Sequence, residues 1–189
     1  MGSIFQTGEP QVINDVLQNR DQRVALQQHL LSRFPKHTLI AIKLNVPGPI
    51  KNNAQLRRLF ETGVARFYEQ LKTLTRDFQT VAQWDKPTGN ELFITTTLAP
   101  VTTKKLAVSF EDHDTLGRLF DVDVLTADQQ RALSRSDFSM PVRKCLICNR
   151  IAKDCARSRR HSVTDLQTKI SELYATEFEP GGGPEPWLN

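Results

Sequence analysis

The sequence lacks a long apolar segment and has few cysteines. No uninterrupted apolar run reaches the roughly 18 residues that a membrane-spanning helix needs. The first residues have neither the basic start nor the apolar stretch of a signal peptide, and Gln6 stands where a myristoylation signal has Ser or Thr. The three cysteines are clustered and odd in number, which argues against a secreted disulfide framework. These absences predict a cytoplasmic protein that does not bind membranes.

The chain also lacks a large excess of charge of either sign, and it has no internal repeat. Its 189 residues, of which 39% are hydrophobic and 24% charged, suit one globular domain with a real core. The net charge of +4 is compatible with a phosphorylated partner or an acidic protein. This charge is too small to indicate nucleic-acid binding by itself.

Helices and strands interleave in the expected secondary structure. Apolar residues at helical spacing predict helices at residues 10–34, 53–74 and 163–178, and Pro100 starts a further helix. Apolar runs and alternating patterns predict strands at residues 38–44, 78–84, 91–98 and 118–125, with Gly117 just before the last of them. The second and third strands are expected to form a hairpin.

For two of these elements, the sequence also predicts which side chains lie on the same face. The first helix is expected to bury its apolar positions, which are Ile13, Val16, Leu17, Val24, Leu26, Leu30 and Leu31. In the second strand, one face is expected to carry Phe78, Thr80, Ala82 and Trp84. The whole pattern predicts an α+β fold with a mixed, mostly antiparallel sheet and helices packed against it. We expect a single domain over residues 1–179 and a flexible Gly- and Pro-rich tail at 180–189.

Two aspartates lie two positions apart in the fourth expected strand. Strand side chains two apart share a face and lie about 6.5 Å from one another at Cα. Asp121 and Asp123 therefore point to one side, while Phe120, Val122 and Val124 point to the other. A plain exposed strand is the simpler interpretation. Because aspartate is a poor strand former, the pair favours a site, and Mg²⁺ is commonly held by such carboxylates together with phosphates.

An acidic block precedes a basic block along the chain. Residues 111–128 contain six acids and one base, whereas residues 143–160 contain seven bases and one acid. If the basic block is helical, Arg150, Lys153, Arg157 and Arg160 form one stripe. A solvated helix face would explain this run of charge, but beside the two aspartates it favours polyphosphate chemistry.

Three cysteines and a histidine lie within the basic block. Cys145, Cys148, Cys155 and His161 could hold a structural zinc ion, although their spacing is tighter than that of a common zinc finger. Redox chemistry of the C-x-x-C pair and burial as small hydrophobic residues are the alternatives. The residue types favour packing over zinc, and zinc over redox chemistry. His161 could equally bind phosphate or transfer a proton.

Four segments together resemble a known family. The segments LNVPGPIKN at 44–52, GRLFDVDV at 117–124, RKCLIC at 143–148 and CARSRRHS at 155–162 are similar to the citrate lyase holo-acyl-carrier-protein synthases. The resemblance runs from the first strand to the last helix. It implies transfer of a phosphoribosyl-dephospho-coenzyme A group from its triphosphate precursor to a serine of the citrate lyase acyl carrier protein, the gamma subunit, with release of diphosphate. By analogy with this reaction, we expect a nucleotidyltransferase-like core.

The resemblance also suggests roles for the residues. Asp121 and Asp123 would hold Mg²⁺, and one of them or a nearby group would accept the serine proton. Substrate-binding roles are expected for Arg118, Lys51, Arg143, Lys144, Arg157, Arg159, Arg160 and His161. The partners would be the carrier protein and triphosphoribosyl-dephospho-coenzyme A, with no nucleic acid.

Two alternative functions remain at the level of sequence. The related malonate decarboxylase system uses a similar transferase with a similar pair of aspartates. A small zinc-stabilised module that binds nucleic acid through the basic block is an alternative of a different class. The basic block has no interleaved aromatic residues to stack on bases, which counts against that module.

Overall fold

Four strands form one antiparallel sheet in the order β2-β3-β1-β4. The computed structural model describes residues 2–129 and 131–179. The strands are β1 (Thr38–Leu44), β2 (Phe78–Lys86), β3 (Gly89–Thr96) and β4 (Phe120–Leu125). The expected α+β class and the hairpin of β2 and β3 are confirmed, and each strand pairing in the described residues is antiparallel. The expected tail at 180–189 lies outside these residues.

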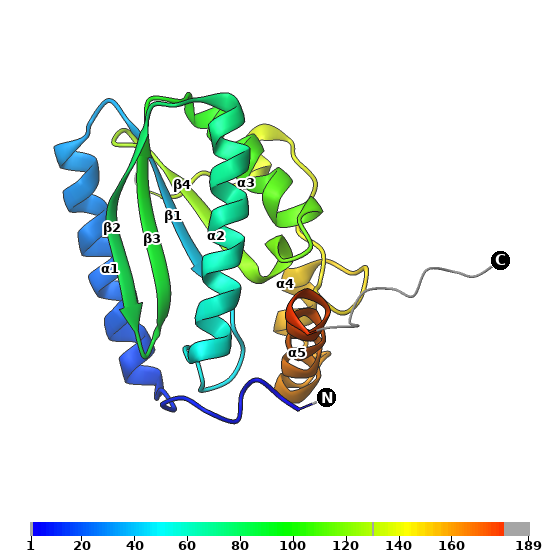
Figure 1. Cartoon of the computed structure of the whole chain (residues 1–189). Coiled ribbons are helices and arrows are strands. Elements are labelled where there is room, and N and C mark those ends of the chain that lie inside the picture. Colours follow the sequence, from blue (N-terminus) through cyan, green and yellow to red (C-terminus); the bar gives the residue numbers. More distant parts are fainter. Residues whose placement is uncertain (1, 130, 180–189) are drawn as a thin grey trace.

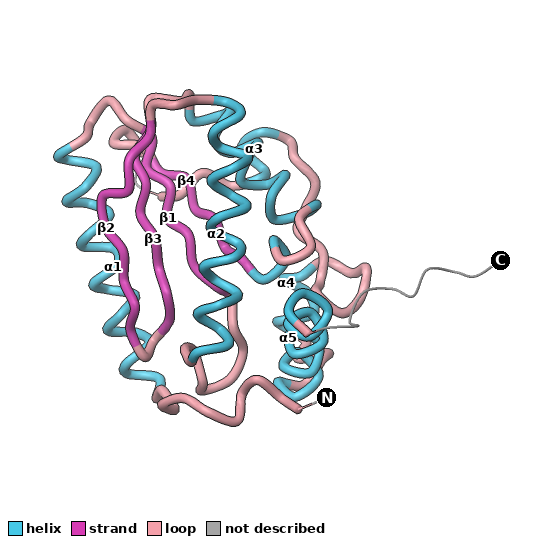
Figure 2. Tube along the Cα trace, viewed as in Figure 1, coloured by secondary structure: helices cyan, strands magenta, loops and turns pink. Residues whose placement is uncertain are grey.

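Helices cover both faces of the sheet (Figure 1). α1 (Ile13–Arg33) lies on one face, whereas α2 (Ala54–Leu74) and α3 (Pro100–His113) lie on the other. Figure 2 shows that the described part of the chain between β4 and α5 (Val163–Phe178) is mostly loop, interrupted by a 3-10 turn (Arg135–Phe138) and the short helix α4 (Ala152–Arg157). The N-terminal segment runs to α5, where the Ile4 amide donates a hydrogen bond to Ser171 Oγ at 3.2 Å. Within the described ranges, no helix is both long and apolar enough to span a bilayer.

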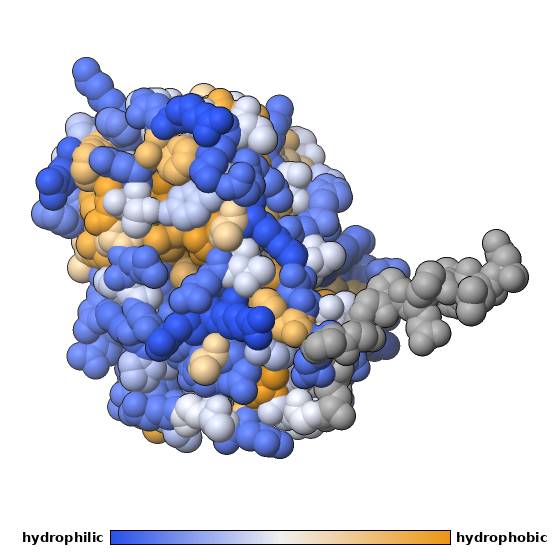
Figure 3. Space-filling model, viewed as in Figure 1, coloured by the Kyte–Doolittle hydropathy of each residue, from blue (hydrophilic) through white to orange (hydrophobic). Residues whose placement is uncertain are grey.

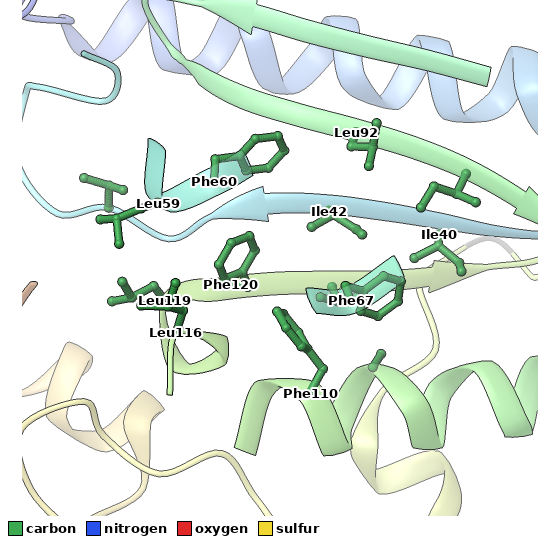
Figure 4. Packing of buried hydrophobic residues seen from close by; sticks show 14 of the residues in the cluster. Ile40, Ile42, Leu59, Phe60, Phe67, Leu92, Phe110, Leu116, Leu119 and Phe120 are labelled. Atoms are coloured by element: carbon green, nitrogen blue, oxygen red, sulfur yellow. The ribbon is translucent and has the colours of Figure 1, made fainter. Parts of the chain in front are cut away.

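The larger hydrophobic core fills the space between the sheet, α2 and α3. Phe120 of β4 stacks on Phe60 with ring centroids 6.0 Å apart, and it meets the edge of Phe110 at 5.3 Å. Figure 4 shows Phe110 rising from α3 toward β4. The surface on the α2 side is mostly hydrophilic in Figure 3, with hydrophobic atoms gathered over the sheet beside α2.

Two glycines allow this core to close around β4. A Cβ atom at Gly63 of α2 would lie 2.1 Å from Cζ of Phe120, so a larger residue there would collide with the ring. A Cβ atom at Gly117 would lie 1.9 Å from the carbonyl oxygen of Phe110. This close approach occurs in a 3-10 turn, Gly117–Leu119, which stands where the sequence pattern predicted the start of the strand. The aspartate strand therefore begins at Phe120, two residues later than the pattern predicted, and Gly117 lies before it, as expected.

The expected buried face of α1 was also partly wrong. Leu30 is buried, but four of the apolar positions expected inside are exposed, namely Ile13, Val16, Leu17 and Val24. The helix instead turns Asn19 toward the sheet, together with Arg23. The helix adopts this orientation because both side chains bind the buried carboxylate of Glu91 on β3.

A β-bulge changes the predicted face of β2. The register shifts between Thr80, which pairs with Ile94, and Ala82, which pairs with Phe93. Because an inserted residue reverses the side-chain alternation, Phe78 packs with the α2-side core while Trp84 packs with the α1-side core. The prediction that these residues share one face was therefore wrong.

Candidate active site

The two aspartates lie side by side on the α1 face of the edge strand β4. β4 alternates as predicted, with Phe120, Val122 and Val124 buried and the aspartates only partly buried. β1 pairs with β4 so that Lys43 stands opposite Asp121 and Ala41 stands opposite Asp123. Opposite residues in a sheet present their side chains to the same face. The register therefore puts an ammonium group beside the carboxylate pair.

Lys43 and Arg143 contact the carboxylate of Asp121 from two directions. Nζ of Lys43 donates a hydrogen bond to Oδ2, and Nη1 of Arg143 lies 3.8 Å from Oδ1. The side chain of Asp121 remains 37% exposed. One carboxylate oxygen thus binds Lys43, and the partly exposed side chain can still meet a ligand.

The pKa values of the two aspartates shift in opposite directions. Burial acts to raise the pKa of Asp121, but the charges of Lys43 and Arg143 outweigh burial and hold this pKa below its ordinary value. Burial and the neighbouring charge of Asp121 raise the pKa of Asp123. Two adjacent carboxylates repel one another, and a divalent cation between them would relieve that repulsion. The donor set therefore fits a magnesium ion.

A second ion-pair group continues this row of charges toward α1. Glu91 on β3 stands opposite Lys43 on β1. Its carboxylate accepts hydrogen bonds from Arg23 Nε at 2.5 Å and from Asn19 Nδ2 at 2.6 Å. Burial acts to lower the pKa of Arg23, but Glu91 and both aspartates together raise it. Acidic and basic groups therefore alternate from β4 to α1.

A cavity of about 430 Å³, here called the carboxylate cavity, opens beside the aspartates. Besides Asp121 and Asp123, its charged lining residues are Lys104, Glu111, Arg135, Arg143 and Lys153. Arg135 binds Glu111 and Asp112, and Arg66 binds Asp114. These arginines neutralise the first half of the acidic block, which leaves the aspartates of β4 as the carboxylates available at this cavity.

A second cavity of about 470 Å³, here called the arginine cavity, lies on the other side of Arg143. Its basic lining residues are Arg118, Arg143, Lys144, Arg159 and His161, and its apolar wall includes Leu146, Leu166 and Ile170. Arg143 lines both cavities. The structure therefore brings five of the predicted substrate-binding residues to one place.

Three other predicted residues lie elsewhere. Arg157 and Arg160 are exposed and line neither cavity. Lys51 lines a separate hollow that also includes Lys43, and its Nζ donates a hydrogen bond to the Val46 carbonyl at 2.6 Å. Burial lowers the pKa of Lys51. The proline-containing loop thus contributes to two separate hollows, because Pro47 lines the arginine cavity whereas Lys51 lines the hollow beside Lys43.

The basic stripe expected on one helix does not form. α4 spans only Ala152–Arg157, so Arg150 and Arg160 fall outside it. The chain instead returns through a turn at Arg159, whose φ of 47° is left-handed. The turn directs Arg159 to the arginine cavity, whereas a continuous helix would have aligned Arg157 with Arg160.

The three cysteines and His161 converge at the edge of the arginine cavity. Their sulfur and nitrogen atoms all lie within 4.8 Å of one another, which makes this set able to bind a metal ion. The Sγ atoms of Cys148 and Cys155 are 3.6 Å apart, and Nε2 of His161 lies 3.4 Å from Sγ of Cys148. Cys145 and Cys155 are buried.

Comparison with known proteins assigns this arrangement to a family. Residues 11–177 match the family model described as apo-citrate lyase phosphoribosyl-dephospho-CoA transferase. The chain belongs to this family. The matched region contains both cavities, the aspartate pair and the Cys–His cluster.

Two of the relatives to which the chain is similar carry the transferase name, and a third is called Protein CitXG. The chain is 34% identical over 178 residues to a probable apo-citrate lyase phosphoribosyl-dephospho-CoA transferase of Streptococcus pyogenes. This match covers 92% of this chain and 91% of the relative. The chain is 36% identical over 162 residues to the Escherichia coli transferase, and the match covers 85% of this chain and 87% of that relative. The chain also matches Protein CitXG of Leuconostoc mesenteroides at 31% identity, where 89% of the chain spans only 36% of that protein.

Sequence reasoning missed Lys43 and Lys153 of this transferase. Lys43 lies in a strand whose other residues are mostly apolar, and a charged residue in such a strand was a usable signal. The partner of Lys43 was not predictable from the sequence, because its pairing with Asp121 depends on which strand lies beside β1. Lys153 was noted only as part of a stripe, yet it lines the carboxylate cavity.

Proposed function

We propose that this chain transfers the phosphoribosyl-dephospho-coenzyme A group from its triphosphate precursor to a serine of the apo citrate lyase acyl carrier protein, the gamma subunit. The serine oxygen forms a bond to the innermost phosphorus, and the bond from that phosphorus to the leaving diphosphate breaks. The observation that carries the proposal is the aspartate pair beside a cavity whose other charged groups are mainly basic. The cytoplasmic location expected from the sequence remains a prediction.

Asp121 and Asp123 are the residues that would hold Mg²⁺. Support comes from their shared face and from the raised pKa of Asp123, which reflects burial and carboxylate repulsion. The ion would supply positive charge to the phosphate oxygens when bound. Lys43 keeps Asp121 in its ionised form, and the pair provides the carboxylates that can accept the serine proton.

Arg143 is the residue that would bind phosphate between the two cavities, since it lines both. Its Nη2 donates hydrogen bonds to the carbonyls of Arg118 and Phe120 at 2.8 and 2.7 Å, which fixes the guanidinium beside β4. Lys153 on one side and Lys144 on the other add charge for the leaving diphosphate. The apolar wall of the arginine cavity suits the organic part of the coenzyme A group. Positioning and charge neutralisation are the main needs of such a transfer.

We also propose a nucleotidyltransferase-like arrangement for the core. An aspartate pair on an edge strand, backed by a helix-covered sheet, supports this comparison with enzymes that transfer nucleotides. The analogy between this chain and those enzymes is in the type of reaction and in the position of the carboxylates.

The test is mass spectrometry of apo carrier protein incubated with this chain, the triphosphate precursor and Mg²⁺. We expect a mass increase equal to the prosthetic group, and no increase when the cation is chelated. The apo carrier protein of malonate decarboxylase serves as the competing acceptor. Faster modification of that carrier would replace citrate lyase by malonate decarboxylase as the partner, and no modification of either would overturn the proposal.

A further inference from the structure

We propose that Cys145, Cys148, Cys155 and His161 bind one structural zinc ion, and that this ion holds the basic segment 143–161 against the start of β4. The inference concerns folding of this segment and does not depend on the transfer reaction. It replaces the simple packing that the residue types favoured.

Two separations between ligand atoms match those of tetrahedral zinc, and the remaining ligand atoms lie within 4.8 Å of one another. With zinc–sulfur bonds near 2.3 Å and zinc–nitrogen bonds near 2.0 Å, two sulfurs lie about 3.8 Å apart, and sulfur and nitrogen lie about 3.5 Å apart. The observed separations are 3.6 Å between Cys148 and Cys155 and 3.4 Å between Cys148 and His161. A disulfide would instead need sulfurs about 2.05 Å apart, and all three cysteines are free.

The backbone presents the ligands in two pairs. Cys145 and Cys148 lie on a turn that is closed by hydrogen bonds from the Cys145 amide to the Arg150 carbonyl at 2.8 Å and from the Ala152 amide to the Arg143 carbonyl at 2.9 Å. Cys155 lies on α4, and the chain folds back after this helix to bring in His161. Two ligands from a closed turn and two from a helix and its exit are typical of small zinc sites.

The alternatives explain less of this arrangement. A redox C-x-x-C pair would need Cys145 and Cys148 alone, without Cys155 and His161. Burial as small hydrophobic residues would account for Cys145 and Cys155, but it gives no reason for an imidazole nitrogen to approach a thiol sulfur. Four potential ligands meeting at one point favour a metal.

The zinc site would fix two arginines of the candidate active site. Arg118 Nη2 donates a hydrogen bond to the Cys145 carbonyl at 2.7 Å, and Arg143 binds the carbonyls of Arg118 and Phe120. These contacts join the turn that carries two ligands to the first residue of β4. Loss of the ion would therefore release the segment while leaving the sheet folded, since the core between β4 and α2 does not include the ligands.

The first experiment measures metal in the full chain purified from zinc-supplemented cells. We expect about one zinc ion per chain by mass spectrometry of the metal, and replacement by Co²⁺ should give the visible absorption of tetrahedral cobalt–thiolate. Both measurements use the wild-type chain, so they do not depend on variants that fold. Negligible zinc together with no cobalt absorption would overturn the proposal.

The second experiment tests the individual ligands. Cys148→Ser and His161→Gln should lose the zinc, whereas His161→Cys should retain it because a thiolate can replace the imidazole. His29→Gln, an exposed histidine on α1, is the matched control and should keep the wild-type content. Chelation should speed trypsin cleavage at Arg143 and Lys144 without cutting the sheet. Wild-type zinc content in Cys148→Ser would contradict the assignment.

Discussion

The two faces of β4 differ in what they contribute to the molecule. On one face, Phe120 packs fully buried among aromatic rings of α2 and α3. On the other, Asp121 and Asp123 face charged groups and a cavity. Substitutions on the buried face should lower stability by changing the volume that fills the core. Substitutions on the charged face should act through the change of charge. One six-residue strand therefore joins the stability of the fold to the chemistry of the site.

The largest effect on the buried face is expected from Phe120→Ala. Removing the ring should lower the free energy of unfolding by about 3–5 kcal/mol, because it leaves a cavity between Phe60 and Phe110. Urea unfolding measures this loss. Val163→Ala, at a half-exposed position, is the control and should change little. A loss below about 1 kcal/mol for Phe120→Ala would remove the contrast between the faces.

On the charged face, Asp121→Asn and Asp123→Asn should abolish most activity without unfolding the chain. Each variant keeps the size of the side chain and removes its charge, so we expect transfer to the carrier protein to slow by about 100-fold or more. Single-turnover mass spectrometry measures the rate. Asp128→Asn, an exposed aspartate just after β4, should act at the wild-type rate. Near-normal transfer by both variants would refute the proposed metal role.

Gly63→Ala probes the buried face from the opposite helix. Alanine is the better helix former by about 1 kcal/mol, yet its Cβ would lie 2.1 Å from the ring of Phe120. We expect a net loss of about 1–3 kcal/mol from overpacking. Combined with Phe120→Leu, the same substitution should cost less, because the collision is removed. Additive losses in this double-mutant cycle would show that the two residues do not interact.

Lys43→Met should have the smallest effect on stability, and the difference from wild type should depend on pH. The folded-state pKa of Asp121 lies below its unfolded value of about 3.9, so the pair stabilises the protein above that value, and the contribution is lost as pH falls through the folded-state pKa. We expect a loss of at most about 1 kcal/mol at neutral pH, since Asp121 is 37% exposed, and convergence with wild type in acid.

Urea unfolding at neutral and acidic pH measures the difference. Lys105→Met, an exposed lysine on α3, is the control and should follow the wild-type curve. A Lys43→Met difference that stays constant across pH would show that Lys43 acts by packing and not by charge.

Local patterns in the sequence predicted much of this fold. The last helix occupies residues Val163–Phe178 as expected, and β1 occupies Thr38–Leu44, because apolar periodicity is strong in both. The shared face of Asp121 and Asp123 also followed from alternation alone. These features depend on residues close together in the chain.

Features that depend on distant residues were not predictable. The bulge at Val81 needs the partner strand to define it, and the rotation of α1 needs Glu91 to bind Asn19. The proximity of Lys43 to Asp121 required the strand order. The cysteines could be counted in the sequence, but their convergence with His161 depends on the turn after α4. The sequence therefore predicted the two carboxylates of β4 but not most of the charged residues around them.

The charged row from Asp121 through Lys43 and Glu91 to Arg23 has an evolutionary consequence. Each group in the row is balanced by a neighbour of opposite sign, so replacing one alone leaves its neighbour uncompensated in a half-buried place. Among relatives, we expect these four positions to vary in complementary pairs or not at all. A lineage that reverses the sign at Glu91, for example, should carry a matching change at Arg23.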